Sequence, residues 1–223
     1  AGAPRFNRWM ADTVRPYTGK DVMEIGAGIG NLTRLLAPRR RSYTATDIDP
    51  EHLARLESRF QHRPNLRVRH CDLSAPQDFR EFAGAMDSVV CLNVLEHIPD
   101  DLQGLRNIHS VLRPGGRAIV LVPHGQSIFG TLDKVLGHYR RYSHQELRGK
   151  MEATGFTVER IVAFNRISRP AWYVSGKLLR RETISPLALK AFDRTVWLWR
   201  RLDAWLPWAP TSIIGIGVKR EAA

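Results

Sequence analysis

V-M-E-I-G-A-G-I-G-N, from Val22 to Asn31, passes from a mostly apolar run into three glycines at every second position. Glycines at this density weaken a strand and a helix alike, because they leave the backbone unrestricted. The stretch therefore predicts a strand that ends near Ile25 and a loop that leads into a helix. In such a loop either the backbone turns very tightly or a ligand lies against it.

Short apolar runs alternate with helical patterns between residues 20 and 164. This alternation predicts an α/β fold with a parallel sheet and helices on both faces. The predicted strands are 22–25, 43–46, 66–68, 88–92, 118–122, 156–164 and a last one within 211–220. The predicted helices are 31–37, 50–60, a weak 78–82, 102–112 and one after the capping-box pattern S-H-Q-E at Ser143, and R-P-G-G at 113–116 predicts a turn.

Residues 165–210 interrupt this alternation with a segment that holds Arg, Trp and Pro. Apolar residues recur there at spacings of four, three, three and four, which predicts a helix near 186–206 with one buried stripe. The members of this stripe are Phe192, Val196, Trp199, Leu202 and Leu206. Arg194, Trp197 and Arg201 are predicted to lie on the opposite side.

The net charge of +12 is distributed unevenly along the chain. From Arg160 to the end there are 12 Lys+Arg and 4 Asp+Glu, so this part carries +8, together with five of the six tryptophans. Such a composition is typical either of a surface for an anionic partner, a membrane or a nucleic acid, or of a solvated helix face over a core that contains tryptophan.

Polar residues follow three more of the predicted strands. Asp47 ends the second strand, about twenty residues after Gly26. Asp72 follows the third strand and Asn93 follows the fourth. The carboxyl ends of parallel strands meet at one crevice, which is the usual ligand site of an open sheet. The alternative is local: the two aspartates would cap helices and Asn93 would occupy a turn.

The glycine loop departs from the dinucleotide fingerprint G-x-G-x-x-G, because its third glycine stands at residue 30 rather than 31. Together V-M-E-I-G-A-G-I-G, A-T-D-I-D-P, N-V-L-E-H-I-P-D and L-R-P-G-G-R resemble the motifs of class I S-adenosylmethionine-dependent methyltransferases. The resemblance covers roughly residues 6–164 and the last strand. It implies a Rossmann-like, seven-stranded, mostly parallel sheet whose last strand is antiparallel, with a helical insertion before that strand.

The resemblance also implies S-adenosyl-L-methionine as cofactor and S-adenosyl-L-homocysteine as product. In the family the glycine loop carries the methionine part, the acid here at Asp47 binds the ribose, and the acid here at Asp72 lies by the adenine. Glu24 is expected as an anchor beneath the loop and Ile48 as one wall of the adenine site. The full expected set of cofactor-binding residues is Trp9, Glu24, Gly26, Ala27, Gly28, Gly30, Asn31, Asp47, Ile48, Cys71, Asp72, Leu73, Asn93 and Val94.

Two segments, F-N-R-W at 6–9 and G-H-Y-R-R-Y-S at 137–143, resemble small bacterial members of this family whose acceptors are mostly unassigned. Methylases of quinone biosynthesis are more distant relatives. The expected organisation is an N-terminal segment at 1–19, a cofactor-binding core at 20–164, an acceptor-side insertion at 165–210 and the final strand within 211–223. Phe6, Asn7 and Trp9 either form a lid over the cofactor or pack into the core.

A base that removes a proton from the acceptor is expected after the fifth strand. The candidates are His124, His138, Tyr139 and Tyr142, with His138 and Tyr139 as the catalytic assignment and the tyrosines otherwise as packing residues. Arg140 and Arg141 either hold an acidic acceptor or are solvated. Glu96 and His97 are expected to begin a helix rather than to bind a metal, because no third ligand is spaced nearby.

The function expected is methylation of oxygen or nitrogen on a small, apolar or aromatic acceptor. One alternative is a nucleic-acid methyltransferase, although N-V-L-E replaces the [DN]-P-P-[YF] of amino-methylases that hold a base. The alternative of another class is a non-catalytic nucleotide-binding protein or an NAD-dependent oxidoreductase. Cys71 and Cys91 lie in apolar runs, which predicts reduced core residues and a cytoplasmic protein, with peripheral membrane contact through its basic region.

Overall fold

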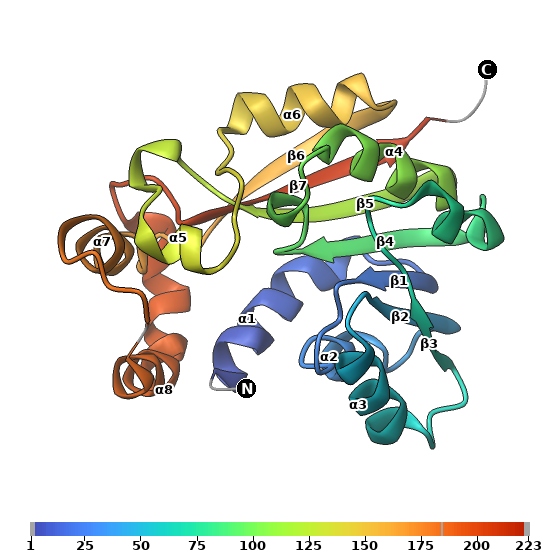
Figure 1. The fold of residues 1–223 in the computed structure, drawn as a ribbon, viewed down its shortest axis with the longest axis horizontal. Helices are drawn as coiled ribbons and strands as arrows, with labels where there is room; N and C mark the ends of the chain where they lie inside the picture. Colours follow the sequence, from blue (N-terminus) through green and yellow to red (C-terminus); the bar gives the residue numbers. More distant parts are fainter. Residues whose placement is uncertain (1–2, 184, 221–223) are drawn as a thin grey trace.

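The computed structural model describes residues 3–183 and 185–220. Figure 1 shows one twisted sheet with helices on both faces and a further group of helices beyond the strand ends on one side. The sheet has seven strands in the order β3-β2-β1-β4-β5-β7-β6. Its strands are β1 (Asp21–Ile25), β2 (Ser42–Asp47), β3 (Leu66–His70), β4 (Met86–Leu92), β5 (Leu112–Pro123), β6 (Phe156–Phe164) and β7 (Ser212–Lys219).

Strands β1 to β5 pair in parallel, whereas β7 runs antiparallel to both of its neighbours, β5 and β6. The expected Rossmann-like fold is therefore confirmed, including the antiparallel last strand. The order of strands reverses between β1 and β4, because the chain fills the β1-β2-β3 side first and then returns. Ligands of open α/β sheets bind at this switch point, outside the carboxyl ends of the strands.

The helices are α1 (Pro4–Val14), α2 (Thr33–Leu36), α3 (Pro50–Phe60), α4 (Asp101–Val111), α5 (Thr131–Val135), α6 (His144–Ala153), α7 (Arg169–Trp172) and α8 (Pro186–Leu202). Successive strand residues point to opposite faces, so Val22 and Met23 enter two separate cores. Helices α4 and α6 cover the core on the side of Met23. Helices α1, α2 and α3 cover the other core.

Local signals account for most element ends. Asp49 caps α3 by accepting the Glu51 N–H, and Ser143 and Glu146 form the predicted capping box of α6. The weak helix at 78–82 is a 3₁₀ helix, Pro76–Phe82. The turn predicted at 113–116 is wrong in one respect, because these residues already belong to β5, where the pairing with β4 is irregular.

The segment before β7 contains α7, a π-helical turn at Tyr173–Leu178 and α8. Figure 1 shows α5, α7 and α8 on the side at which the β4 arrow ends. The predicted buried stripe is only partly correct: Val196 is buried, but Leu202 is 41% exposed. Leu202 is the last residue of α8, and the helical periodicity does not continue into the 3₁₀ turn Asp203–Trp205 that follows. Within the described residues no helix is both long and apolar enough to cross a membrane.

Candidate functional site

The glycine loop joins β1 to α2, and Gly26, Gly28 and Gly30 all have positive φ, at 70°, 55° and 78°. Two of them also allow close packing. A Cβ on Gly26 would lie 2.3 Å from Val94 Cγ2, and a Cβ on Gly30 would lie 2.5 Å from Phe60 Cε2. These two glycines therefore bring the loop against the end of β4 and against α3.

Gly28 differs from the other two, because a Cβ there would meet no atom within 4 Å. Its N–H donates to Asp47 Oδ2 at 2.7 Å, so the loop is fixed to the end of β2. Open space above a fixed, bare backbone is the property that a ligand pressed against the loop requires.

Asp47 is buried at the end of β2 and has several partners. In addition to the Gly28 contact, its Oδ1 accepts the Asp49 N–H at 3.0 Å and lies 3.2 Å from His52 Nδ1. The neighbouring Ile48 is 61% exposed, which is unusual for a large apolar side chain next to buried ones. The carboxylate and an apolar wall thus lie beside each other at the switch point.

Glu24 lies within β1 and is almost fully buried. Its Oε2 accepts the Thr33 Oγ1–H at 2.6 Å and the Tyr43 O–H at 2.9 Å. Burial raises the pKa of Glu24 to about 7, against these hydrogen bonds, which lower it. Glu24 therefore ties β1 to β2 and to the start of α2 beneath the loop, and its contact with a cofactor stays a prediction.

The ends of β3 and β4 contribute in different ways. Asp72 is partly exposed, and its Oδ1 accepts both the N–H and the hydroxyl of Ser74, so it also forms a local turn. Cys71 and Leu73 are buried and their side chains belong to the core. Asn93 has φ of 57° and an exposed side chain, which places its amide at the carboxyl end of β4.

Three more residues of the expected cofactor set differ in exposure. Ala27 is buried and Asn31 is partly exposed. Trp9 is 7% exposed, and its ring packs against Phe164 at 4.7 Å and against Phe6 at 5.9 Å between centroids. Trp9 therefore packs into an aromatic cluster of the core, and its cofactor contact stays a prediction.

The candidate bases after β5 occupy distinct environments. Tyr142 is buried, its hydroxyl donates to Asp101 Oδ2 at 2.8 Å, and burial raises its pKa, so it has a packing role. His124 Nδ1 lies 2.8 Å from the Tyr142 carbonyl oxygen. Tyr139 is 58% exposed, with the Arg140 guanidinium 5.8 Å from its ring centroid.

The two arginines of the G-H-Y-R-R-Y-S segment both pair with carboxylates of the chain itself. Arg140 pairs with Asp101 at 2.8 Å and donates to the Pro99 carbonyl at 2.7 Å. Arg141 is buried and donates from Nε to Asp133 Oδ1 at 2.7 Å. The solvated role is therefore wrong for the buried Arg141, whereas Arg140 is partly exposed, and contact of either arginine with an acceptor stays a prediction.

The structure brings Glu96 and His97, which follow β4, together with His138, which follows α5. One ligand-capable atom from each lies within 4.8 Å of the other two. Glu96 is fully buried, and among the described residues neither of its carboxylate oxygens has a hydrogen-bond partner. Burial raises the pKa of Glu96 to about 8. Local spacing could not reveal this group, because its third member is distant in sequence.

Two hollows, of about 260 and about 450 Å³, lie at the amino ends of the strands, at the other end of the sheet from the glycine loop. The first is lined by residues such as Gly19 and Gly116, and the second by residues such as Asp21 and Ser42, at the amino ends of the strands. Neither contains a residue of the glycine loop. The concentration of polar groups at the carboxyl edge, rather than cavity size, marks the candidate site.

Comparisons with known proteins agree with this geometry. Residues 23–118 match a family model described as a methyltransferase domain. A ubiquinone biosynthesis O-methyltransferase from Pseudomonas aeruginosa is 36% identical over 104 residues, 46% of this chain and 44% of that protein. A relative from Mycolicibacterium smegmatis, named as a probable S-adenosylmethionine-dependent methyltransferase, is 32% identical over 146 residues, 63% of this chain and 53% of that one.

Among solved structures, the [4+2]-cyclase SpnF superposes with a TM-score of 0.67 over 96% of this chain and 82% of the other, at 16% identity, which shows the fold alone. The chain spans less than half the length of the Pseudomonas relative. Over residues 23–118 the chain is similar to methyltransferase domains, and its sheet has the fold of class I S-adenosylmethionine-dependent methyltransferases.

Proposed function

We propose that the chain binds S-adenosylmethionine at the carboxyl ends of β1, β2 and β4 and transfers its methyl group to a small acceptor. The observation that carries this proposal is the open space at Gly28 on a loop that Asp47 fixes. Similarity to S-adenosylmethionine-dependent methyltransferases supports this cofactor, and the residues present fit it. Two ribose hydroxyls need a carboxylate, and an adenine ring needs an apolar wall such as the exposed Ile48.

In this proposal the chain's own groups divide the work. The loop from Gly26 to Asn31 would hold the methionine part, Asp47 the ribose, and Asp72 with Ile48 the adenine. Asn93 and Val94 would border the reacting end. The cofactor supplies an already activated methyl group, so the main task of the chain is to orient an acceptor, which can contribute roughly 7–11 kcal/mol.

For the acceptor we propose an apolar or aromatic compound methylated on oxygen or nitrogen. Helices α7 and α8 lie beyond the carboxyl edge of the sheet (Figure 1), where they can cover such a compound. The name of the Pseudomonas relative, an O-methyltransferase of ubiquinone biosynthesis, supports oxygen. The exposed Tyr139 is our candidate for a group that touches the acceptor. The ring of His138 lies beside Glu96 instead, with Nε2 3.9 Å from Glu96 Oε1.

The test is calorimetric titration with S-adenosylhomocysteine. We expect Asp47→Asn to weaken binding tenfold or more. The proposed contacts with the two ribose hydroxyls and the hydrogen bond from the Gly28 N–H all depend on the charge of this carboxylate. Asp100→Asn is the matched control, because Asp100 also accepts a backbone N–H at a helix start but lies at α4. Equal affinities of the two variants would contradict the site. NAD binding in place of S-adenosylhomocysteine would favour the oxidoreductase. Binding of S-adenosylmethionine without transfer of its methyl group to any acceptor would favour the non-catalytic alternative.

We also propose that the basic C-terminal region contacts an anionic membrane. Along α8 one helical stripe is exposed and combines apolar with basic side chains: Leu187, Lys190, Arg194, Trp197 and Arg201. Leu187 is 80% and Trp197 is 60% exposed. A helix with this composition binds at the lipid interface, since the apolar groups enter the headgroup region while cations meet the phosphates.

Sedimentation with vesicles tests this contact. We expect binding to phosphatidylglycerol-containing vesicles at low salt, weaker binding at high salt, and little binding to phosphatidylcholine alone. Arg194→Glu with Arg201→Glu should reduce binding severalfold. Arg106→Glu with Arg148→Glu, on α4 and α6, changes the net charge equally and should reduce it much less. An equal loss of vesicle binding in both double variants would contradict membrane contact. Binding of the protein to RNA but not to vesicles would contradict it as well.

A further inference from the structure

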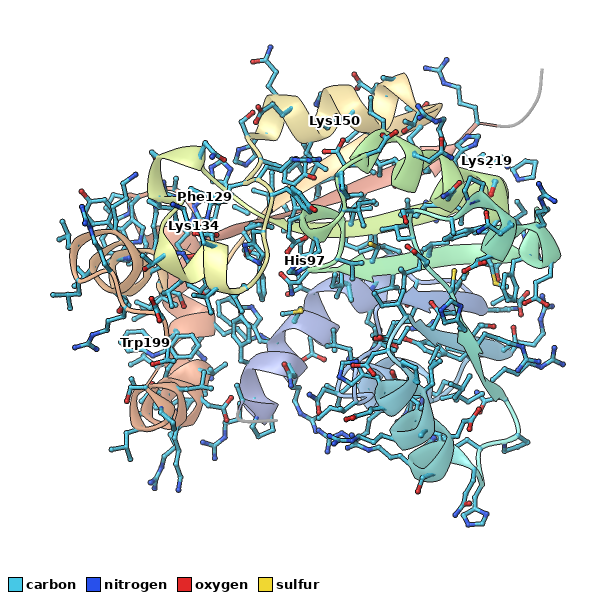
Figure 2. The ribbon with its side chains drawn as sticks, in the orientation of Figure 1. His97, Phe129, Lys134, Lys150, Trp199 and Lys219 are labelled. Carbon is cyan, nitrogen blue, oxygen red and sulfur yellow. The ribbon has the colours of Figure 1, made fainter. Side chains whose placement is uncertain are left out.

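Glu96, His97 and His138 form a compact group that the proposed methyl transfer does not use. Figure 2 shows His97 at the carboxyl end of β4, beside the segment that follows α5. Glu96 and His97 are in the 3₁₀ turn Leu95–His97 that continues β4. His138 comes from the other side, in the loop between α5 and α6. The site therefore depends on the tertiary fold and not on one element.

The carboxylate of Glu96 is the unusual member of the group. Its side chain is fully buried, yet neither oxygen has a hydrogen-bond partner in the part of the chain that is described. Leaving a buried carboxylate without a partner is costly, and native proteins rarely do so without a function. Glu96 Oε1 lies 3.9 Å from His138 Nε2, too far for a hydrogen bond but a separation that an ion bonded to both atoms can bridge.

Both imidazoles have their Nδ1 atoms engaged on the far side. His138 Nδ1 lies 2.9 Å from Asp133 Oδ1, and His97 Nδ1 lies 3.3 Å from the Gly137 carbonyl oxygen. A Nδ1–H that donates to these oxygens leaves the Nε2 lone pair available. Metal-binding histidines have this arrangement, in which an outer carboxylate or carbonyl fixes the tautomer and the ring orientation.

Asp133 is itself held in place. It is fully buried and accepts hydrogen bonds from Arg141 Nε at 2.7 Å and from the Gly130 N–H at 3.0 Å. Arg141 is buried as well, with its guanidinium carbon 5.0 Å from the Trp172 ring centroid. These contacts give Arg141 a structural role: it orients the Asp133 carboxylate, which in turn orients the His138 ring.

We propose that Glu96, His97 and His138 bind one divalent first-row transition-metal ion, with Zn²⁺ as the reference case. Two imidazoles and one carboxylate suit these ions, whereas Mg²⁺ and Ca²⁺ prefer oxygen donors alone. Donors around Zn²⁺ at about 2.0–2.2 Å from the ion are roughly 3.4 Å apart, so donors within 4.8 Å would have to approach one another by about 1 Å. His97 is partly exposed and its Nδ1 contact is long, at 3.3 Å, so we expect this ring to make the movement.

Three protein donors leave coordination positions open. Because Glu96 and His97 follow Asn93 by only a few residues, the ion would lie near the end of β4, where it could polarise an oxygen of the acceptor. This role rests on the proposed methyl transfer, whereas metal binding itself does not. The experiment therefore measures the metal alone, without cofactor or acceptor.

The full chain, freed of metal with a chelator, is titrated with Zn²⁺ by calorimetry and with Co²⁺ by visible absorption. We expect one ion per chain, and at least tenfold weaker binding in His97→Ala and in Glu96→Gln. Exposed His62, after α3, provides the control: His62→Ala should bind within twofold of the parent protein. Circular dichroism melting of the metal-free variants shows whether they are folded, and His97→Ala is the milder change because its ring is partly exposed.

Several outcomes would overturn the proposal. One is the absence of saturable Zn²⁺ or Co²⁺ binding in the parent protein. Another is binding that His97→Ala and Glu96→Gln leave unchanged, which would put the ion elsewhere. A third is a site that takes Mg²⁺ but not Zn²⁺ or Co²⁺. S-adenosylhomocysteine affinity of the metal-free protein is measured separately, so that failure here leaves the proposed function standing.

Discussion

Gly26, Gly28 and Gly30 share a left-handed backbone, but they meet different surroundings. Gly26 and Gly30 lie against neighbouring side chains, and Gly28 lies against open space. One sequence pattern thus combines two needs, close packing of the loop and access for a ligand. The repeated spacing in the sequence cannot separate them, because the neighbours come from β4 and α3.

Alanine at two of these glycines should separate stability from binding. Gly30→Ala forces a Cβ against Phe60 and Leu56, so we expect the free energy of unfolding to fall by about 2–4 kcal/mol. Gly28→Ala has no clash and should cost only about 1 kcal/mol of backbone strain. Its S-adenosylhomocysteine affinity should fall tenfold or more. Urea unfolding and calorimetry measure both, and normal affinity of Gly28→Ala would argue against a ligand there.

Glu24 gives the apo protein a pH dependence. Its pKa is about 7 in the folded chain, against an ordinary value of 4.5 for a solvated glutamate such as that of the unfolded chain. Between these values the unfolded chain loses a proton that the folded chain keeps, so stability falls as pH rises from about 4.5 to 7. Tyr43 and Asp47 face the carboxyl group, and the Asp47 charge raises the same pKa.

Glu24→Gln removes this titration. We expect the variant to gain stability relative to the parent protein as pH rises from 4.5 to 8, by an amount on the order of 3 kcal/mol. Urea unfolding without ligand at several pH values measures the difference. A difference that stays constant with pH would show that Glu24 ionises alike in both states.

At the scale of elements, α1 is capped from outside its own segment. Its N-cap residue, Ala3, offers no side-chain acceptor. Asp193 of α8 supplies one instead, because its Oδ1 accepts the N–H groups of Arg5 and Phe6, both at 2.9 Å. A carboxylate at the positive end of a helix is favourable, so α8 stabilises the start of α1.

Asp193→Ala should therefore loosen α1 more than α8. We expect faster hydrogen exchange of the Arg5 and Phe6 amides, and a loss of about 1–2 kcal/mol in the free energy of unfolding. Asp193→Asn keeps an acceptor oxygen and should retain most of the protection. Similar exchange in the alanine and asparagine variants would mean that the cap contributes little.

Elements with strong local patterns were predictable, and elements set by distant contacts were not. The strand from Phe156 to Phe164 and the helix from Pro50 to Phe60 match the prediction at both ends. Leu202 fits the apolar periodicity but is exposed at the end of α8, and periodicity alone does not show where a helix ends. The same limit applies to the site: strand ends predicted Asp47, but the meeting of Glu96 with His138 required the fold.

At the scale of the whole molecule, β7 holds the sheet together on one side. It pairs with β5 over Arg117–Pro123 and with β6 over Phe156–Phe164. In the described sheet β6 has no other strand neighbour. Deleting 212–220 should therefore release β6 and leave β5 paired only with β4, and we expect loss of cooperative thermal unfolding by circular dichroism. A sharp transition in the shortened chain would show that β1 to β5 fold independently.

The position of β7 also has a consequence for the order of events on the ribosome. Strands β2 to β5 can pair as they emerge, because each has a neighbouring strand in the part of the chain already made. Strand β6 emerges well before β7, which is its one neighbour in the described sheet. Until β7 emerges, the backbone N–H and C=O groups of β6 and of one side of β5 have no strand to pair with. Exposed ladders invite pairing with other chains. The nascent protein is thus most vulnerable to aggregation while residues 165–211 are being synthesised, and a chaperone that covers the β5 edge would act in that interval.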